Sequence, residues 1–471
     1  MNSTKLLQIL KTLDPGEWEK LYFFLQSPYF TQEKVSPRLF TLLHPYFADS
    51  AAGLPKAETL FQALWPDQPF DRKQLNYALS RLNKLTERFL VFQQLEQQTD
   101  RQQLTALEVF SERHLEKHLA ATQRSFNERL LPAPDEKDDF YLVRSDYADL
   151  LDQHYVRTKA RKQDNNIQLA TDDLDRFYYF RRLRYACSML DRQNILEANY
   201  RIGLSQAWLD HLEGSTLVEE PMIGLYLTIF RALQEEEQEQ HFRELKSRLL
   251  QLVGKGLAES LAEPLLFAIN YCARKIRAGQ EAYVKEAIDL YHRGIDSGLL
   301  LQDGQVSPWT YTNLVKLTLR LQQYAEAREF ISKYTDLLPE SFRENAHNYN
   351  YAELLYCTNE KEKAQEYLNR VAFSDLGYYL GARVLLAKIY YETDAEEALL
   401  SLLASFTIFL QRNKQISRNL KKTYLNFCQL LSRLLRTEPG KTGKIIDLIT
   451  HTQPLTDRSW LLALAQEKSR T

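Results

Sequence analysis

Residue types that often carry chemistry occur in this chain, but their spacing gives none of them a convincing site. His114 and His118 are four residues apart, a spacing that places two imidazoles on one face of a helix and suits a metal ion. The segment reads HLEKH rather than HExxH, so Glu116 falls on another face and cannot act as the base of a metalloprotease. No third ligand is evident, and we therefore expect two exposed helix histidines and no metal site.

Cysteine spacing also gives no chemical motif. The four cysteines lie far apart, each in an apolar helical pattern: Cys187, Cys272, Cys357 and Cys428. The sequence has no CxxC pair, no glycine-rich phosphate loop and no GxSxG turn. We expect buried free thiols, no cofactor and no enzymatic activity. A helical enzyme whose site is assembled from distant residues is the alternative that the sequence leaves open.

A cationic segment near the C-terminus is the sharpest charge feature. No acidic residue occurs between Glu397 and Glu438. Seven basic residues lie in that window, and the first five form a basic patch: Arg412, Lys414, Arg418, Lys421, Lys422, Arg433 and Arg436. Such a patch can bind an acidic protein tail, a phosphorylated segment or nucleic acid. The alternative is a solvated basic surface that balances acidic stretches such as residues 233–240.

A second basic feature lies on a long helix expected over residues 71–98, whose apolar positions recur every three or four residues. Four basic side chains fall within an ~80° stripe opposite the apolar face: Lys73, Arg81, Lys84 and Arg88. With the residues from 56 onward, this helix resembles the helix-turn-helix head of a transcriptional regulator, which implies DNA contacts by these four side chains. A solvated face of an amphipathic helix is the alternative, and no strand pair for a wing is evident.

The elements that must position these residues are helices. Among 471 residues there are only 15 Gly and 15 Pro, so the residues that favour turns and break helices are few, whereas good helix formers are abundant. The net charge of −2 argues against a dedicated nucleic-acid coat. The N-terminus has no signal-peptide pattern, and no run approaches the ~20 apolar residues of a membrane span. We expect an all-α, soluble, cytoplasmic protein without a membrane partner.

Proline usage and helical periodicity divide the chain into three expected parts. Short proline-punctuated helices and the long helix that follows predict an N-terminal helical domain over residues 1–98, with a capping box at residues 14–17. The pattern of residues 99–300 predicts long helices, among them one over 101–130. These helices do not repeat at a regular interval, so we expect an irregular helical-hairpin region there. Residues 301–471 continue as helical pairs, and no low-complexity linker separates the parts.

Helical pairs between residues 307 and 405 repeat a pattern. The second helix of each pair begins with a small residue that is followed four positions later by an aliphatic one: Ala327 and Ile331, Ala364 and Leu368, Ala398 and Leu402. The alanines are 37 and 34 residues apart, and a weaker earlier unit surrounds Ala287 and Tyr291. Ser307-Pro308 gives the first pair an N-cap and a proline at the first helical position.

This pattern resembles the tetratricopeptide repeat, in which helical hairpins stack into an α-solenoid. The whole chain is also similar to a broad class of long helical bacterial proteins. In the repeat family the first helices line a concave groove, which implies ligand contacts by Asn313, Lys316, Arg320, Tyr349, Asn350, Arg383 and Lys388. Ordinary solvated groove residues are the alternative.

The resemblance implies a non-enzymatic scaffold or adaptor whose partner is a protein or peptide, an acidic one being a candidate. The second hypothesis is a DNA-binding transcriptional regulator, with a head at residues 56–98 and the repeats as its effector domain.

Overall fold

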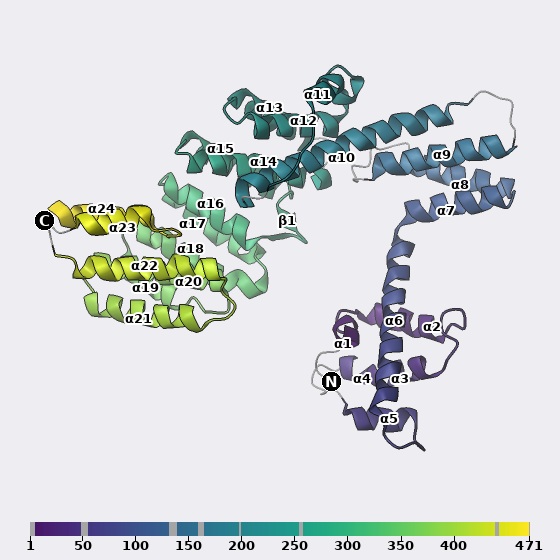
Figure 1. The fold of residues 1–471 in the computed structure, drawn as a ribbon, viewed down its shortest axis with the longest axis horizontal. Helices are drawn as coiled ribbons and strands as arrows, with labels where there is room; N and C mark the ends of the chain where they lie inside the picture. Colours follow the sequence, from purple (N-terminus) through teal and green to yellow (C-terminus); the bar gives the residue numbers. More distant parts are fainter. Residues whose placement is uncertain are drawn as a thin grey trace. The chain divides into compact units, whose positions relative to one another are not determined.

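Helices make up most of the described chain (Figure 1). The computed structural model describes residues 5–48, 55–130, 139–158, 164–196, 199–253, 258–438 and 442–470. Within these ranges the sheet structure is one antiparallel pair, β1 (Leu301–Gln302) and β2 (Gln305–Val306). Both turn residues between them, Asp303 and Gly304, have positive φ, as a tight hairpin turn requires. The expected all-α class is confirmed.

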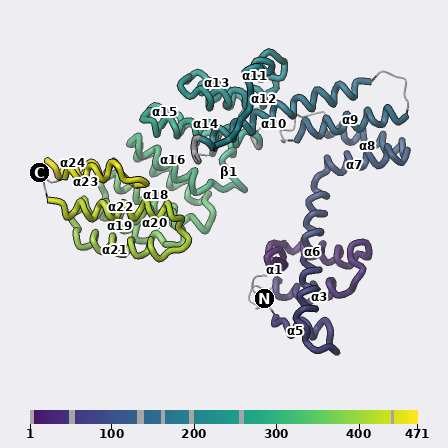
Figure 2. The backbone as a smooth tube through the Cα atoms, in the orientation of Figure 1, coloured from purple at the N-terminus to yellow at the C-terminus, as the bar shows by residue number. Residues whose placement is uncertain are grey.

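The chain divides into two compact units, Met1–Tyr178 and Tyr179–Thr471. Their backbone can be followed in Figure 2. The three-part division expected from the sequence, with boundaries after residues 98 and 300, stays a prediction. No helix in the described ranges combines the length and the apolar character needed to cross a bilayer.

The first unit begins with short helices that pack around one long helix. Its helices are α1 (Lys5–Leu10), α2 (Pro15–Gln26), α3 (Val35–Leu43), α4 (Pro45–Ala48), α5 (Ala57–Leu64), α6 (Arg72–Gln97), α7 (Thr99–Glu112), α8 (Glu116–Leu130) and α9 (Phe140–Thr158), and α10 (Asn166–Leu196) continues into the second unit. Leu75, Leu79 and Leu82 on α6 belong to the core that α1, α2, α3 and α5 surround. The predicted capping box is confirmed, because Asp14 accepts from the Glu17 amide at 2.8 Å and Glu17 accepts from the Asp14 amide at 3.0 Å.

The helix expected over residues 101–130 is broken in two. His114 has a φ of 56° and lies in the turn between α7 and α8, so the expectation that His114 and His118 share a helix is wrong. The turn lets α8 pack back on α7, and Leu107 and Phe126 are both buried there. Because no glycine or proline marks this turn, local sequence signals could not reveal it.

The second unit is built from helices that pack on their neighbours in sequence. They are α11 (Gln206–Glu213), η1 (Thr216–Glu219), α12 (Pro221–Gln234), α13 (Glu239–Val253), α14 (Ala258–Arg277), α15 (Ala282–Asp296), α16 (Pro308–Arg320), α17 (Tyr324–Tyr334), η2 (Thr335–Leu337), α18 (Glu340–Cys357), α19 (Lys361–Asn369), α20 (Leu376–Glu392), α21 (Glu396–Arg412), α22 (Arg418–Arg436), α23 (Gly443–His451) and α24 (Arg458–Arg470). The hairpins α16–α17, α18–α19 and α20–α21 stack through α16, α18 and α20, and one apolar core runs through them.

The repeated alanines occupy equivalent places in only two of the three hairpins. Ala327 and Ala364 are each the fourth residue of their helix, α17 and α19, and both are fully buried. In α21 the fourth residue is Leu399, which is buried, whereas Ala398 is exposed. The expected alignment of the third hairpin is therefore wrong by one residue, because α21 begins at Glu396.

The predicted N-cap of α16 is confirmed, since the Ser307 hydroxyl accepts from the Thr310 amide at 3.1 Å.

Three of the four cysteines are buried, as expected, but Cys357 is exposed. Cys357 is the last residue of α18. Burial raises the pKa of the Cys272 thiol to about 12, and also raises the pKa of Cys187. Buried thiols of this kind stay protonated and unreactive at neutral pH.

Candidate partner-binding surface

Lys316, one of the predicted groove residues, already has an acidic partner. Its Nζ lies 3.9 Å from Glu353 Oε1 and 5.3 Å from the centre of the Tyr349 ring. The Tyr349 hydroxyl donates a 2.6 Å hydrogen bond to the same Glu353 oxygen. Burial, together with the neighbouring carboxylate, raises the pKa of Tyr349 well above its ordinary value. The hydrogen bond to Glu353 is thus made by Tyr349, while Lys316 lies near the same carboxylate with its side chain 50% exposed.

Tyr349 and Asn350 lie inside the hairpin stack. The exposed fraction is 6% for Tyr349 and zero for Asn350. Asn350 Nδ2 donates to Thr312 Oγ1 at 3.2 Å and to the Ala346 carbonyl at 2.8 Å. The expectation that both residues face a ligand does not fit this burial. Because α18 packs against both α16 and α20, these positions face neighbouring helices rather than solvent.

The remaining predicted groove residues of α16 are exposed but engaged. The Arg320 guanidinium forms an ion pair with Glu281, with Nε 3.0 Å from Oε2. Asn313 Nδ2 donates to the Tyr291 hydroxyl at 3.3 Å. Both side chains therefore tie α16 to the preceding hairpin.

The predicted groove residues of α20 are half-buried and also have partners. The Arg383 guanidinium lies 4.6 Å from the centre of the Tyr379 ring. Lys388 Nζ donates to Asp457 Oδ1 at 3.0 Å and lies 5.7 Å from the Trp460 ring. Lys388 thus attaches α20 to the segment that leads into α24. The structure brings Lys316 and Tyr349 together, but it does not gather the seven predicted groove residues into one site.

The basic residues of α22 form a row along one face of the helix. At 100° per residue, Arg418, Lys422, Arg433 and Arg436 fall within about 60° of one another, over a rise of about 27 Å. All four side chains are exposed. Within the described ranges, none of them makes a hydrogen bond or an ion pair. This row of positive charge is available to a ligand.

The other predicted residues of the basic patch adjoin this row. Arg412 ends α21, Lys414 lies in the turn before α22, and both are exposed, whereas Lys421 is half-buried. We call the whole set the C-terminal basic surface: Arg412, Lys414, Arg418, Lys421, Lys422, Arg433 and Arg436. The sequence prediction restricted the patch to its first five members, although the 3.6-residue period would have aligned Arg433 and Arg436 with Arg418.

Local helix energetics do not account for these cations. Arg418, Lys421 and Lys422 lie in the first turns of α22, whose first turn contains no acidic residue. The amino end of a helix carries partial positive charge and favours acidic side chains, so basic ones cost free energy there. Only the Ser417 hydroxyl compensates, by accepting from the Leu420 amide at 3.3 Å. The opposite face of α22, including Phe427, is buried, which holds the row in place.

The acidic stretch at residues 233–240 does not need the C-terminal basic surface for neutralisation. Glu235 pairs with Arg231 at 3.1 Å. Glu236 pairs with Arg274 at 2.7 Å, and Glu239 with Arg243 at 3.0 Å. The stretch is therefore largely balanced by its own neighbours.

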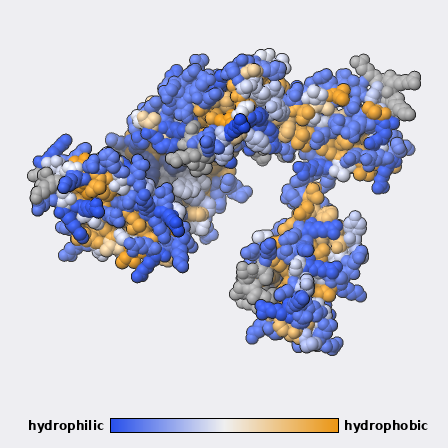
Figure 3. Space-filling view, viewed as in Figure 1, coloured by the Kyte–Doolittle hydropathy of each residue, from blue (hydrophilic) through white to orange (hydrophobic). Residues whose placement is uncertain are grey.

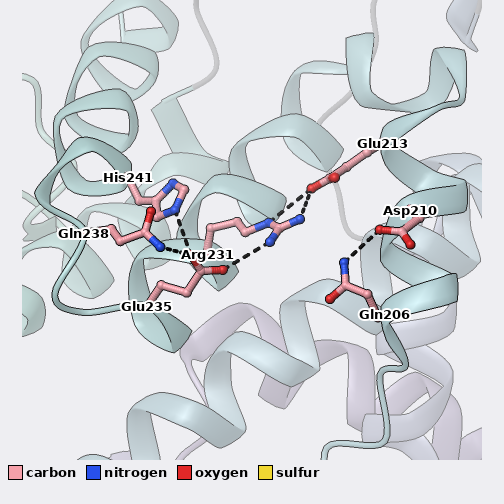
Figure 4. Close-up of polar contacts among 7 residues, drawn as sticks. All are labelled: Gln206, Asp210, Glu213, Arg231, Glu235, Gln238 and His241. Atoms are coloured by element: carbon pink, nitrogen blue, oxygen red, sulfur yellow. Dashed lines mark hydrogen bonds and ion pairs between the residues drawn. The ribbon is translucent and has the colours of Figure 1, made fainter.

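Figure 4 shows the most connected part of that neutralisation. The Arg231 guanidinium binds the carboxylates of Glu213 and Glu235, and His241 Nε2 lies 3.2 Å from Glu235 Oε2. Burial opposes ionisation of Glu235, but hydrogen bonds from Arg231 and His241 lower its pKa. The cluster joins α11 to the turn between α12 and α13. Its charged side chains pair with one another, so the cluster holds these segments together.

The predicted nucleic-acid contacts all lie on the exposed face of α6: Lys73, Arg81, Lys84 and Arg88. Arg81 Nε is 3.4 Å from Glu33 Oε1, and the Arg88 guanidinium lies 5.2 Å from the centre of the Phe30 ring. The two lysine side chains make no hydrogen bond or ion pair in the part of the chain that the structure describes. Half of this row is thus engaged within its own unit.

Ionisable side chains also meet elsewhere in the described ranges, as where the Tyr226 hydroxyl donates to Glu263 at 2.8 Å. These ranges hold no cluster of three His, Cys, Asp or Glu side chains that could bind a metal ion. A hollow of about 470 Å³ lies over α13 and α15, with Lys246 and Glu286 in its lining. Lys246 Nζ is 2.6 Å from Glu286 and 2.7 Å from Asp289, so these charged groups beside the hollow pair with one another.

Comparison of the chain with protein-family models, with curated proteins and with solved structures finds no match in any of the three. Charge and geometry therefore carry the functional argument.

Proposed function

We propose that this protein is a non-enzymatic scaffold that binds an acidic segment of a partner protein on its C-terminal basic surface. The observation that carries the proposal is the row of four exposed, unpaired cations on α22. Charge-assisted hydrogen bonds from Arg and Lys to carboxylates are stronger than neutral ones and supply specificity. The stacked hairpins give this surface a rigid support, which lowers the entropy lost on binding.

The same proposal includes a tetratricopeptide-like solenoid as the support. It is supported by the hairpins α16–α17 and α18–α19, in which a fully buried alanine allows the second helix to pack closely. The ligand surface that we favour differs from the concave groove of that family. The groove side chains are buried or paired with neighbours, whereas the charges of α22 are not.

A protein partner fits this surface better than nucleic acid does. The chain has a net charge of −2, whereas general nucleic-acid binders carry an excess of positive charge. Along α22 the exposed row offers cations but no exposed aromatic ring on which a base could stack, since Tyr424 is half-buried. An acidic peptide needs only the charges.

The test compares capture by the full-length protein with capture by a charge-reversed variant, Arg418→Glu/Lys422→Glu/Arg433→Glu/Arg436→Glu. We expect a nuclease-resistant protein partner with an acidic segment to bind the wild type and to be lost from the variant. A matched control reverses four exposed cations of the first unit, which keeps the charge change the same: Arg101, Arg113, Lys117 and Arg124. Equal capture by the variant and the wild type would overturn the proposal.

A DNA-binding regulator is a second candidate, favoured by the free lysines Lys73 and Lys84 on one face of α6. It predicts duplex binding whose affinity falls steeply with salt and is lost when the four basic residues of α6 become alanine. Duplex affinity that is indifferent to those substitutions would exclude this role for α6.

A further inference from the structure

The outer face of α6 carries a second exposed row, in the other unit of the protein. At 100° per residue, six side chains fall within about 80° of one another. We call this set the α6 outer row: Tyr77, Arg81, Lys84, Arg88, Val91 and Leu95. All six are exposed, with exposed fractions of 68% for Tyr77, 59% for Val91 and 43% for Leu95.

The row changes character along the helix. Its middle is cationic, whereas its C-terminal end is apolar, and Phe92 extends that end with an exposed fraction of 36%. Figure 3 shows hydrophobic surface along this part of α6. Several apolar side chains exposed together on one helix mark an interaction site more often than single exposed ones do.

The helix is held in shape at this end without help from a partner. The side-chain amide of Gln102 donates to the carbonyls of Leu95 and Glu96, at 2.9 and 2.7 Å. The Leu95 carbonyl also accepts from the Gln98 amide at 3.1 Å, and the Gln102 bond to Glu96 supplies a donor to a carbonyl group at the helix end, where intrahelical donors run out. Val91, Phe92 and Leu95 are therefore presented on a preformed helix.

We propose that the α6 outer row binds an amphipathic helix of a partner protein, with apolar side chains against Val91, Phe92 and Leu95 and acidic side chains against Lys84 and Arg88. Charge complementarity selects this occupant, because Arg81 is paired with Glu33, whereas Lys84 and Arg88 have no carboxylate partner among the described residues. Helices pair in this way through residues three and four positions apart. The proposal concerns a surface separate from the C-terminal basic surface and stands or falls without it.

Two other occupants fit less well. A second copy of the chain, aligned in parallel, would set Arg81, Lys84 and Arg88 against the same cations, which is repulsive. Nucleic acid would use the cations and Tyr77, but Val91 and Leu95 offer it neither a stacking ring nor a hydrogen-bond donor.

The experiment places a photoreactive phenylalanine analogue at position 95 of the full-length protein and cross-links in native lysate. The control carries the same group at Gln97, which is exposed on another face of α6. We expect an adduct only from position 95, on a peptide with apolar residues at helical spacing and flanking Asp or Glu. Adding Lys84→Glu should lower its yield about threefold to tenfold.

Three outcomes would overturn the inference. They are an adduct with nucleic acid, an adduct with another copy of this chain, and a yield at position 95 no higher than at position 97. A protein adduct that is insensitive to Lys84→Glu would also contradict it, because the charge match is part of the claim. Circular dichroism of each variant shows whether α6 is still folded.

Discussion

Two regions of the second unit use basic residues in opposite ways. In the hairpins α16 to α20, Lys316, Arg320 and Lys388 each have a carboxylate partner on another element. On α22, the basic row has no carboxylate partner among the described residues, and part of it lies at the helix end that disfavours positive charge. The paired cations of α16 and α20 join neighbouring segments, whereas the cations of α22 make no ion pair among the described residues.

This difference between α22 and the hairpins separates the cations that stabilise the fold from those that are free to bind a ligand. Removing a largely buried, paired cation such as Lys388 costs free energy, because its carboxylate partner is left uncompensated. An exposed, unpaired cation contributes little to stability, so its removal should lower the affinity for a ligand without changing the free energy of unfolding. Substitutions in the two regions therefore make opposite predictions.

The largest effect on stability is expected from Asn350→Asp in the hairpin stack. The new carboxylate would be fully buried beside the Ala346 carbonyl, and the expected loss is about 3 kcal/mol at pH 7. Burial would raise its folded pKa above the unfolded value, so the loss should shrink as pH falls through the folded pKa. Urea unfolding at several pH values measures this. Asn313→Asp, on the exposed side of α16, is the control and should cost far less.

A smaller effect is expected from Lys388→Ala. The side chain is 17% exposed and pairs with Asp457, so its removal should cost about 1–3 kcal/mol. A double-mutant cycle with Asp457→Ala measures the coupling. Lys422→Ala on α22 should change the free energy of unfolding by less than about 0.5 kcal/mol. If the two lysines proved equally costly, the contrast between the regions would fail.

One pH effect is expected in strong alkali. Burial raises the pKa of Tyr378 to about 12, and its hydroxyl lies 2.9 Å from Thr312 Oγ1. A folded pKa above the unfolded value of about 10 means that the contribution is complete below pH 10 and is lost as pH rises toward 12. Absorbance at 295 nm would follow this ionisation, with Tyr378→Phe as the control. Ionisation of Tyr378 near pH 10 without unfolding would contradict the burial of this hydroxyl between α20 and the start of α16.

A small effect on stability, and the only favourable one, is expected from Arg418→Glu. An acidic residue in the first turn of α22 should stabilise the protein by about 0.3–1 kcal/mol. The same substitution should weaken binding of an acidic probe such as poly-glutamate. Thermal unfolding and fluorescence anisotropy measure the two effects. A loss of stability would show that Arg418 has a structural role that its geometry does not reveal.

Part of the site could be predicted from the sequence because charge is a property of composition. The absence of acidic residues between Glu397 and Glu438 is visible without coordinates, and it located the basic surface. The groove residues could not be predicted in this way. Family position placed Asn350 toward a ligand, but its burial depends on how α18 packs between two other helices.

The sequence by itself determined the helical class, the cap at Ser307 and the capping box at residues 14–17, because propensity and capping are local interactions. Tertiary structure alone decided that the chain turns at His114 and that Leu399 rather than Ala398 is buried. It also decided which cations find carboxylates, since Lys388 and Asp457 are far apart in sequence and meet only through the packing of α20 near α24. Pairing across elements depends on long-range geometry, which neither periodicity nor composition contains.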